Sequence, residues 1–183
     1  MRLNVRYNAP VVLTFSLLAT AALILSQIGG GRVLYYFTAP GTFDFANPVM
    51  YVRLFTHVLG HESWRHLLAN LMVILLIGPL LEEKYGSAKL LLMICVTALV
   101  TAILNVVLFN TGLLGASGVA FMMIVLSSLV NLRKGELPLT FVLVAGLFLG
   151  GEIAAGLHRD NISQFAHIVG GVCGAAFGFR TRD

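Results

Sequence analysis

The sequence predicts an all-α membrane protein, built as a polytopic bundle of six transmembrane helices. Of its 183 residues, 58% are hydrophobic and only 11% are charged, and the mean hydropathy is +0.90. Soluble globular domains have about 45–50% apolar and about 25% charged residues, so this composition is typical of an integral membrane protein. In addition, no Asp, Glu, Lys or Arg occurs between residues 90 and 132, a run too long for one membrane-spanning helix.

The hydrophobic segments divide into six expected spans, because about 20 helical residues cross a hydrocarbon core about 30 Å thick. These spans are residues 11–28, 65–82, 88–109, 117–131, 138–156 and 162–179, in one domain that covers residues 1–183. Residues 29–64 are rich in Gly, Pro and aromatics and are expected to form a long loop with no room for a full span. The first apolar segment is longer than the core of a usual signal peptide, so we expect a retained helix.

Lys and Arg are distributed unequally between the two ends of the expected spans. With the N-terminus in the cytoplasm, eight of the twelve Lys and Arg residues lie on the cytoplasmic side. The positive-inside rule therefore predicts that both termini are cytoplasmic and that the loop 29–64 lies outside. No organelle targeting sequence is evident, which favours a bacterial inner membrane. The cations form no basic tract, so we expect no nucleic-acid partner.

Four polar side chains fall at a similar depth on three of the expected helices. His66 and Asn70 share one face of the second helix, because they are four residues apart. Ser117 begins the fourth helix, and His167 lies about 7–8 Å into the sixth at 1.5 Å per residue. Ionisable residues within a membrane are costly and normally face the bundle interior or a wet cavity. A serine, a candidate base and two further donors favour a nucleophile site with oxyanion stabilisers.

The residues around Ser117 suit such a site. Gly115 and Gly118 would let backbone and substrate approach closely, and the start of a helix offers free N–H groups and a partial positive charge. Both features suit the negative oxygen that develops when a serine attacks a carbonyl. No Asp or Glu is obviously placed to orient His167, so we predict a Ser–His dyad; Glu152 remains a less favoured third member.

Glycines on the sixth helix have a structural interpretation that supports the functional one. A Gly-x-Ser-Gly run by itself more often reflects close helix packing than catalysis. Gly170, Gly174 and Gly178 form a GxxxGxxxG ridge, which we expect to pack the sixth helix tightly on the fourth near Gly118. Such packing would bring His167 to Ser117.

Other ionisable residues favour structural roles. His57 and His61 are four residues apart, which raises a metal hypothesis. However, His61 and His66 are five apart, one residue more than the zinc signature H-E-x-x-H requires. We therefore expect no metal or other cofactor, and expect His57 and His61 to organise the loop by hydrogen bonds. Glu83 is expected to be a buried acceptor for backbone N–H groups at the inner end.

Four motifs follow one another along the chain: HESWRHLLAN (61–70), EKYGS (83–87), GASG (115–118) and AHIVGGVCG (166–174). They match a His-x-x-x-Asn element, a glutamate-and-glycine turn, Gly-x-Ser-Gly and Ala-His-x-x-Gly-x-x-x-Gly. In this order and spacing they resemble the rhomboid intramembrane serine proteases of the compact six-helix bacterial type. The resemblance runs from about Tyr51 to Phe179. One departure is Val52-Arg53, where the family often has Trp-Arg.

The resemblance implies roles for particular residues. Ser117 would be the nucleophile and His167 the general base and acid, with His66, Asn70 and the Ser117 backbone N–H as the oxyanion hole. Phe121 takes the place of an aromatic residue that packs on the catalytic histidine. The glycines of the two motifs would support the site; these are Gly115, Gly118, Gly170 and Gly174.

The resemblance also implies that the partners are the lipid bilayer and transmembrane-helix substrates, cut in or next to their membrane segment near the outer face. One alternative is a proteolytically inactive rhomboid-like protein that binds membrane clients. Another is a small transporter or channel, which is disfavoured because no inverted repeat is evident and the polar residues stop at one depth. The sequence does not indicate the oligomeric state, the physiological substrate or the organism.

Overall fold

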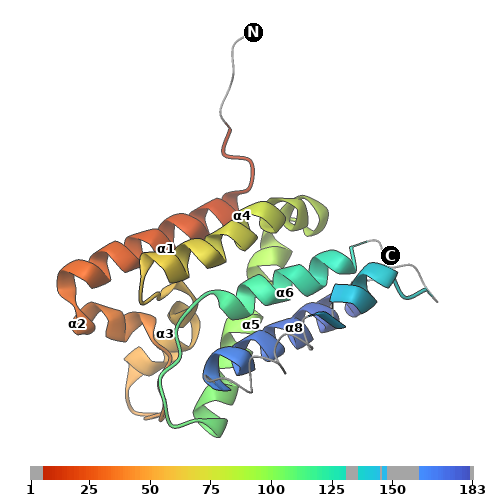
Figure 1. Cartoon of the computed structure of the whole chain (residues 1–183). Helices are drawn as coiled ribbons and strands as arrows, with labels where there is room; N and C mark the ends of the chain where they lie inside the picture. Colours follow the sequence, from red (N-terminus) through yellow and green to blue (C-terminus); the bar gives the residue numbers. More distant parts are fainter. Residues whose placement is uncertain (1–5, 131–135, 145, 148–160, 182–183) are drawn as a thin grey trace.

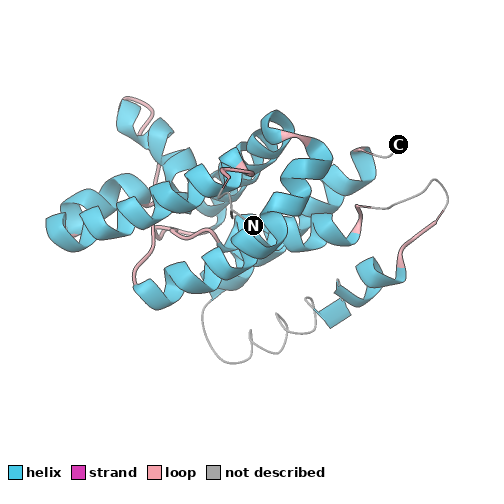
Figure 2. Ribbon diagram, turned by 90° about the horizontal axis from the view of Figure 1, so that it is seen from above, coloured by secondary structure: helices cyan, strands magenta, loops and turns pink. Residues whose placement is uncertain are grey.

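A computed structural model describes residues 6–130, 136–144, 146–147 and 161–181. These residues are helical apart from their connecting turns and one isolated β-bridge between Ala39 and Leu113 (Figure 2). The helices are α1 (Pro10–Gly29), α2 (Gly31–Leu34), η1 (Tyr35–Phe37), α3 (Pro48–Thr56), η2 (His57–Leu59), α4 (Trp64–Tyr85), α5 (Ser87–Leu108), α6 (Ser117–Ser128) and α8 (Asn161–Arg180). α1 lies beside α4, and α6 lies beside α8 (Figure 1).

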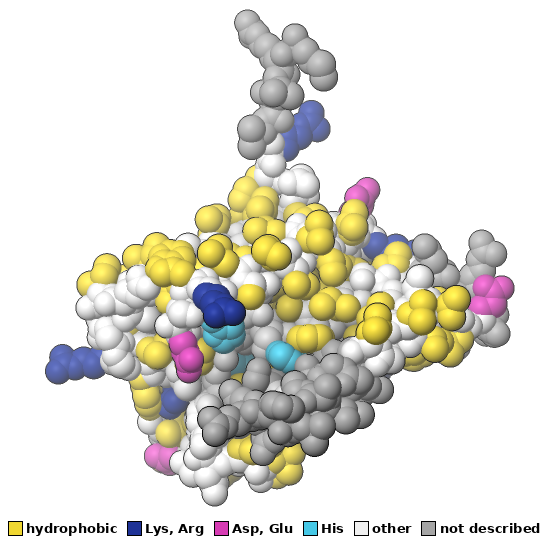
Figure 3. Space-filling view, viewed as in Figure 1, with side chains coloured by type: hydrophobic (Ala, Val, Ile, Leu, Met, Phe, Trp, Pro, Cys, Tyr) yellow, Lys and Arg dark blue, Asp and Glu magenta, His cyan; other side chains and the backbone are white. Residues whose placement is uncertain are grey.

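The all-α membrane fold class is confirmed. α1, α4 and α5 are each long and apolar enough to cross a membrane, and hydrophobic side chains cover much of the face shown in Figure 3. Because a water-soluble protein rarely exposes such extensive apolar surface, this surface is typical of contact with lipid. About half of the predicted fifth span, 138–156, falls outside the described residues; within it, residues 139–144 and 146–147 are helical. The prediction of six spans thus stays a prediction.

α6 is shorter than predicted and lies at the centre of the bundle. It has 12 residues and ends at Ser128, not at residue 131. At 1.5 Å per residue it is about 18 Å long, against a hydrocarbon core of about 30 Å. It packs against α4, α5 and α8, and most of its residues are buried: Gly118, Val119, Ala120, Met122, Met123, Val125 and Leu126. α6 is therefore too short to cross a hydrocarbon core by itself.

The segment 29–64 contains no full span, as predicted, but it is more ordered than a simple loop. It folds into the short helices α2, η1, α3 and η2. Arg53 on α3 is buried; its Nε donates to the carbonyl of Thr38 at 2.7 Å, and its guanidinium lies 3.8 Å from the centre of the Tyr35 ring. These contacts tie α3 to η1, so the arginine of Val52-Arg53 anchors the segment without a neighbouring Trp.

The prediction for Glu83 was wrong by one residue. Glu83 is exposed, whereas Glu82 is buried at the end of α4. The Glu82 carboxylate accepts the backbone N–H groups of Val11 and Val12 at 3.0 Å each, and the Ser87 hydroxyl at 2.7 Å. It thus caps the N-terminus of α1, where a negative charge is favoured by the helix dipole. Neighbouring residues on a helix point about 100° apart, so a one-residue error exchanges a buried position for an exposed one.

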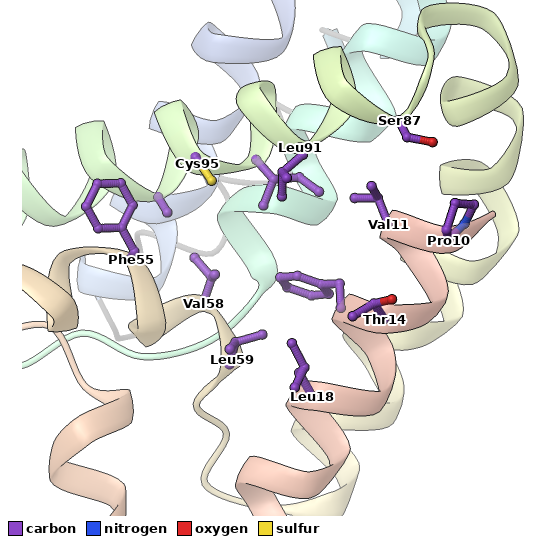
Figure 4. Close-up of a pocket in the computed structure, with 13 residues that line it drawn as sticks. Pro10, Val11, Thr14, Leu18, Phe55, Val58, Leu59, Ser87, Leu91 and Cys95 are labelled. Atoms are coloured by element: carbon purple, nitrogen blue, oxygen red, sulfur yellow. The ribbon is translucent and has the colours of Figure 1, made fainter.

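An apolar groove of about 420 Å³ lies between α1, α5 and η2 (Figure 4). Phe15, Phe55, Val58, Leu91 and Ile94 are among its lining residues, and Cys95 is the one ionisable side chain in the lining. Two of its walls, α1 and α5, are helices long enough to cross a membrane. The groove has no convergent polar groups, which distinguishes it from a candidate active site.

Candidate active site

The start of α6 is shaped by a glycine that no other residue could replace without strain. Gly115 has φ +124°, a conformation that side chains disfavour. A Cβ atom at this position would also lie 2.9 Å from both Cε1 and Nε2 of His66. The imidazole of His66 therefore rests against the backbone two residues before Ser117. Ser117 is the first residue of α6, which has no side-chain cap, so its first-turn N–H groups are not satisfied within the helix.

α6 and α8 touch through their backbones. A Cβ at Gly170 would overlap the carbonyl group of Gly118, and a Cβ at Gly174 would overlap the carbonyl oxygen of Met122. From the other side, a Cβ at Gly118 would lie 3.2 Å from the carbonyl oxygen of Ala166. The glycine ridge therefore packs on α6 near Gly118 as the sequence predicted. Small residues permit this close approach of two membrane helices.

This packing carries His167 to the Ser117 end of α6. Ala166 and Gly170, on either side of His167 along α8, both contact Gly118. The His167 ring lies on the ring of Phe121, with 4.2 Å between the ring centres and 34° between the planes. Ser117 and Phe121 are four residues apart and share one face of α6. His167 therefore lies against the face of α6 that carries Ser117.

α4 contributes His66 and Asn70. Ser63 caps this helix by accepting the backbone N–H of His66 at 3.2 Å, which fixes where α4 begins and places both residues in its first two turns. His66 is half-buried and lies against Gly115, two residues before Ser117, and histidine side chains reach the surface near the middle of the face shown in Figure 3. The structure thus brings four predicted residues from three helices to one region.

His61 is a residue of this region that the sequence analysis assigned only to the loop. Its Nε2 lies 3.1 Å from the Asn70 Nδ2 and accepts the backbone N–H of Ala116 at 3.4 Å. Its Nδ1 lies 3.2 Å from the Leu59 carbonyl oxygen, and its ring meets the His66 ring edge-on at 4.9 Å. His61 therefore links the loop, α4 and the start of α6. Its partners are 9 and 55 residues away, and no sequence periodicity signals such contacts.

His57 makes a second link to the start of α6, and its ring carries a proton on Nε2, the atom that accepts a hydrogen bond in His61. Its Nε2 donates to the Ala98 carbonyl on α5 at 3.1 Å, and its own carbonyl accepts the N–H of Gly115 at 3.0 Å. Both histidines lie outside the spanning helices. Desolvation by burial lowers the pKa of His57 to about 4, although its bond to Ala98 opposes this. Burial likewise lowers the pKa of His61 to about 4, against the bond to Leu59 and with a smaller contribution from His66. Both side chains are therefore neutral at pH 7.

The predicted organising role of His57 and His61 is thus confirmed by their hydrogen bonds. Within the part of the chain that the structure describes, no three His, Cys, Asp or Glu side chains are grouped to hold a metal ion. Glu152, the suggested third member of the dyad, lies outside the described residues. Chemically, a serine at an uncapped helix start, beside a histidine and several N–H donors, can act as a nucleophile and can stabilise an anion.

The fold and this region define an integral membrane protein with a serine and a histidine on two closely packed helices. Residues 48–183 match the sequence model of the Rhomboid domain. This match covers well over half of the chain, so the protein belongs to the rhomboid family.

Three relatives illustrate the range of this similarity. The chain is 29% identical over 132 residues to Rhomboid protease GlpG of Haemophilus influenzae, an alignment that covers 69% of this chain and 68% of that protein. It is 32% identical to Rhomboid-related protein 1 of Caenorhabditis elegans, over 85% of this chain and 48% of the relative. It is 26% identical to the chloroplastic Rhomboid-like protein 11 of Arabidopsis thaliana, over 81% of this chain and 56% of the relative. The chain thus spans about half the length of the last two relatives.

Proposed function

We propose that this protein is an intramembrane serine endopeptidase that hydrolyses peptide bonds in or next to transmembrane helices of other membrane proteins. The observation that carries the proposal is the position of His167 against the face of α6 that begins with Ser117. The glycine contacts at Gly118 and the stacking on Phe121 both support it. Family membership supports it independently, since a relative is named a rhomboid protease.

In the proposed mechanism, the Ser117 hydroxyl attacks the carbonyl carbon of the substrate while His167 takes up its proton. The carbonyl oxygen becomes negatively charged and is stabilised by the Ser117 backbone N–H, His66 and Asn70. The intermediate collapses as His167 returns the proton to the leaving amine, which leaves an acyl ester on Ser117. Water, deprotonated by His167, then hydrolyses this ester and restores the serine.

The site supports a particular class of substrate. α6 is shorter than the hydrocarbon core is thick, so we infer that one of its ends lies within the hydrocarbon depth. A substrate helix can reach that depth from the bilayer, but its peptide bonds must first be released from helical hydrogen bonds. We therefore infer that segments that unwind easily are preferred. We further infer a single six-helix domain over residues 1–183, cytoplasmic termini, a site open to the outer side and a bacterial inner membrane, all from the sequence pattern.

The proposal is tested by incubating the purified protein, in detergent and in liposomes, with a fluorogenic transmembrane peptide. We expect the wild type to cleave the peptide, and Ser117→Ala and His167→Ala to be inactive with unchanged thermal unfolding. Cleavage by Ser117→Ala would contradict the mechanism. If a folded wild type cleaves no substrate in either environment, the inactive, client-binding alternative replaces the proposal.

A further inference from the structure

We propose that His61 is the positioning residue of the site: its unprotonated Nε2 holds the Asn70 amide and the Ala116 N–H in the arrangement that stabilises the oxyanion. This inference rests on the proposed function, because it assigns a role in the same reaction. It concerns a residue that does not touch the substrate and that acts through Asn70 and the backbone before Ser117.

The first support is the convergence of two donors on one acceptor. The Asn70 side chain comes from α4 and the Ala116 N–H from the residue before α6, and both lie within hydrogen-bond distance of His61 Nε2. Asn70 and His61 are both buried, so a donor without a partner there would be costly. One N–H of the Asn70 amide points to His61, which leaves the second N–H free to bind an oxyanion.

The second support is that the hydrogen-bond partners of His61 determine which of its ring nitrogens carries the proton. A backbone N–H can only donate, so Nε2 must be the acceptor for Ala116. The Leu59 carbonyl can only accept, so Nδ1 carries the proton. A protonated imidazole would present N–H to two other donors and would break both contacts. The arrangement therefore requires a neutral His61 with its proton on Nδ1.

The surroundings keep His61 neutral. The ring is buried, and the titratable groups around it are His66 on α4, whose ring meets it edge-on, and His57 in η2, whose carbonyl binds the N–H of Gly115. His167 on α8 is a further titratable group of the candidate site, and Glu62, the next residue in the chain, is exposed. Burial is the main reason that the pKa of His61 falls to about 4. A positive charge on His66 would oppose one on His61.

His57 differs from His61 in the direction of its side-chain hydrogen bond. Its ring donates through Nε2 to the Ala98 carbonyl, and it contacts neither Asn70 nor Ala116 through its side chain. A purely structural role for buried histidines in this segment would make both residues sensitive to the same substitutions. If His61 has the positioning role, only the variants at His61 should depend on whether the new side chain can accept a hydrogen bond.

The test compares His61→Gln with His61→Met, two side chains of similar length and volume. Glutamine can place its Oε1 near the position of Nε2 and accept both N–H groups, whereas methionine cannot do so effectively. We expect kcat of His61→Met to fall roughly tenfold or more, toward the about 10²–10³-fold loss known for removal of an oxyanion donor. KM should change little, because the interaction strengthens in the transition state. The Gln variant should retain several times the kcat of the Met variant.

An activity-independent measurement uses nuclear magnetic resonance of the protein labelled with ¹⁵N in its five histidines. The signals that disappear in His61→Gln identify His61. We expect them to show a proton on Nδ1, an unprotonated Nε2, and no titration between about pH 5 and about pH 8. As the matched comparison, His57 should carry its proton on Nε2.

The outcomes distinguish the positioning role of His61 from the proposed function of the protein. A proton on Nε2 of His61, or protonation near its ordinary pKa, would overturn the positioning role whatever the activity. Equal losses of kcat in the Gln and Met variants would also overturn it. If the wild type is inactive while the spectrum shows the expected tautomer, the proposed function fails and the Nδ1–H arrangement stands. If His61→Met does not fold, the Gln variant and the spectrum still test the proposal.

Discussion

The two sides of the candidate site are built by different physical means. On the α8 side, His167 is positioned by glycines whose backbones touch α6, with no room for an additional carbon atom. On the α4 side, the start of α6 is held by hydrogen bonds to two buried, neutral histidines, His57 and His61. The first side therefore depends on volume, and the second on the placement of protons. Substitutions and pH should affect these two sides separately.

The largest effect on cleavage is expected from added volume on the α8 side. Gly170→Ala places a methyl group against the Gly118 carbonyl, so α8 must move away from α6 and His167 with it. We expect a loss of roughly 3 kcal/mol in the free energy of unfolding, typical of overpacking that forces a backbone shift, and nearly complete loss of cleavage. Thermal unfolding in detergent and the peptide assay measure these effects.

The matched control is Ala176→Val, which adds carbon atoms at an exposed position of the same helix. This variant should unfold and cleave like the wild type. If Gly170→Ala behaves like the control, the contrast between the two sides of the site is wrong.

Acid should weaken the α4 side. His57 and His61 have pKa values of about 4 in the folded protein and about 6.5 when unfolded. The unfolded chain therefore binds more protons between these values. Their stabilising contribution is complete above about pH 6.5, falls as the pH decreases, and is lost at about pH 4. Each histidine accounts for up to about 3 kcal/mol.

Thermal unfolding at a series of pH values checks this expectation. His57→Gln should show a shallower decrease in stability below about pH 6.5 than the wild type, since it lacks one of the titrating groups. A wild-type stability that does not change over this range would show that the histidines are not buried and neutral.

A smaller effect is expected from Glu82→Gln, which weakens buried hydrogen bonds far from the candidate site. Glu82→Gln removes the negative charge that binds Val11, Val12 and Ser87. We expect a loss of about 2 kcal/mol in the free energy of unfolding, with kcat unchanged, because α1 lies outside the candidate site. Glu83→Gln, on the exposed neighbouring residue, is the control and should have no effect. A loss of kcat in Glu82→Gln would show that α1 and the site are coupled.

The smallest effect is expected at the aromatic contact between the two helices of the α8 side. Phe121→Leu removes the ring on which His167 lies, a contact of about 1 kcal/mol, so kcat/KM should fall about fivefold. Phe121→Tyr keeps the ring and should cleave faster than the Leu variant. If the two variants cleave equally, the ring does not orient His167.

The sequence predicted the parts of the molecule that depend on local pattern. The bounds of α1, α4, α5 and α8 agree with the expected spans to within three residues, because long apolar runs bounded by polar residues define a membrane helix. The packing of α8 on α6 through Gly170, Gly174 and Gly178 was likewise visible as a spacing. The ridge and the common depth of the polar residues predicted that Ser117 and His167 converge.

The remaining features depend on contacts that a sequence pattern does not reveal. The end of α6 at Ser128 is not marked by a change in hydrophobicity, and the contacts of the buried Arg53 with Thr38 and Tyr35 join residues that are 15 and 18 positions apart. Glu82 and Glu83 are chemically identical, so only the orientation of the helix distinguishes them. His61 was assigned to the loop because its partners, Asn70 and Ala116, are brought together only by the folded chain.

The most direct test of the central claim is covalent labelling of the purified protein with a fluorophosphonate. Attack by the Ser117 oxygen on phosphorus would form a P–O bond and release fluoride, with the hydroxyl proton passing to His167. We predict that mass spectrometry will locate a single adduct on Ser117, and that both Ser117→Ala and His167→Ala will remain unlabelled. Labelling of another residue, or of His167→Ala at the wild-type rate, would contradict a dyad of Ser117 and His167.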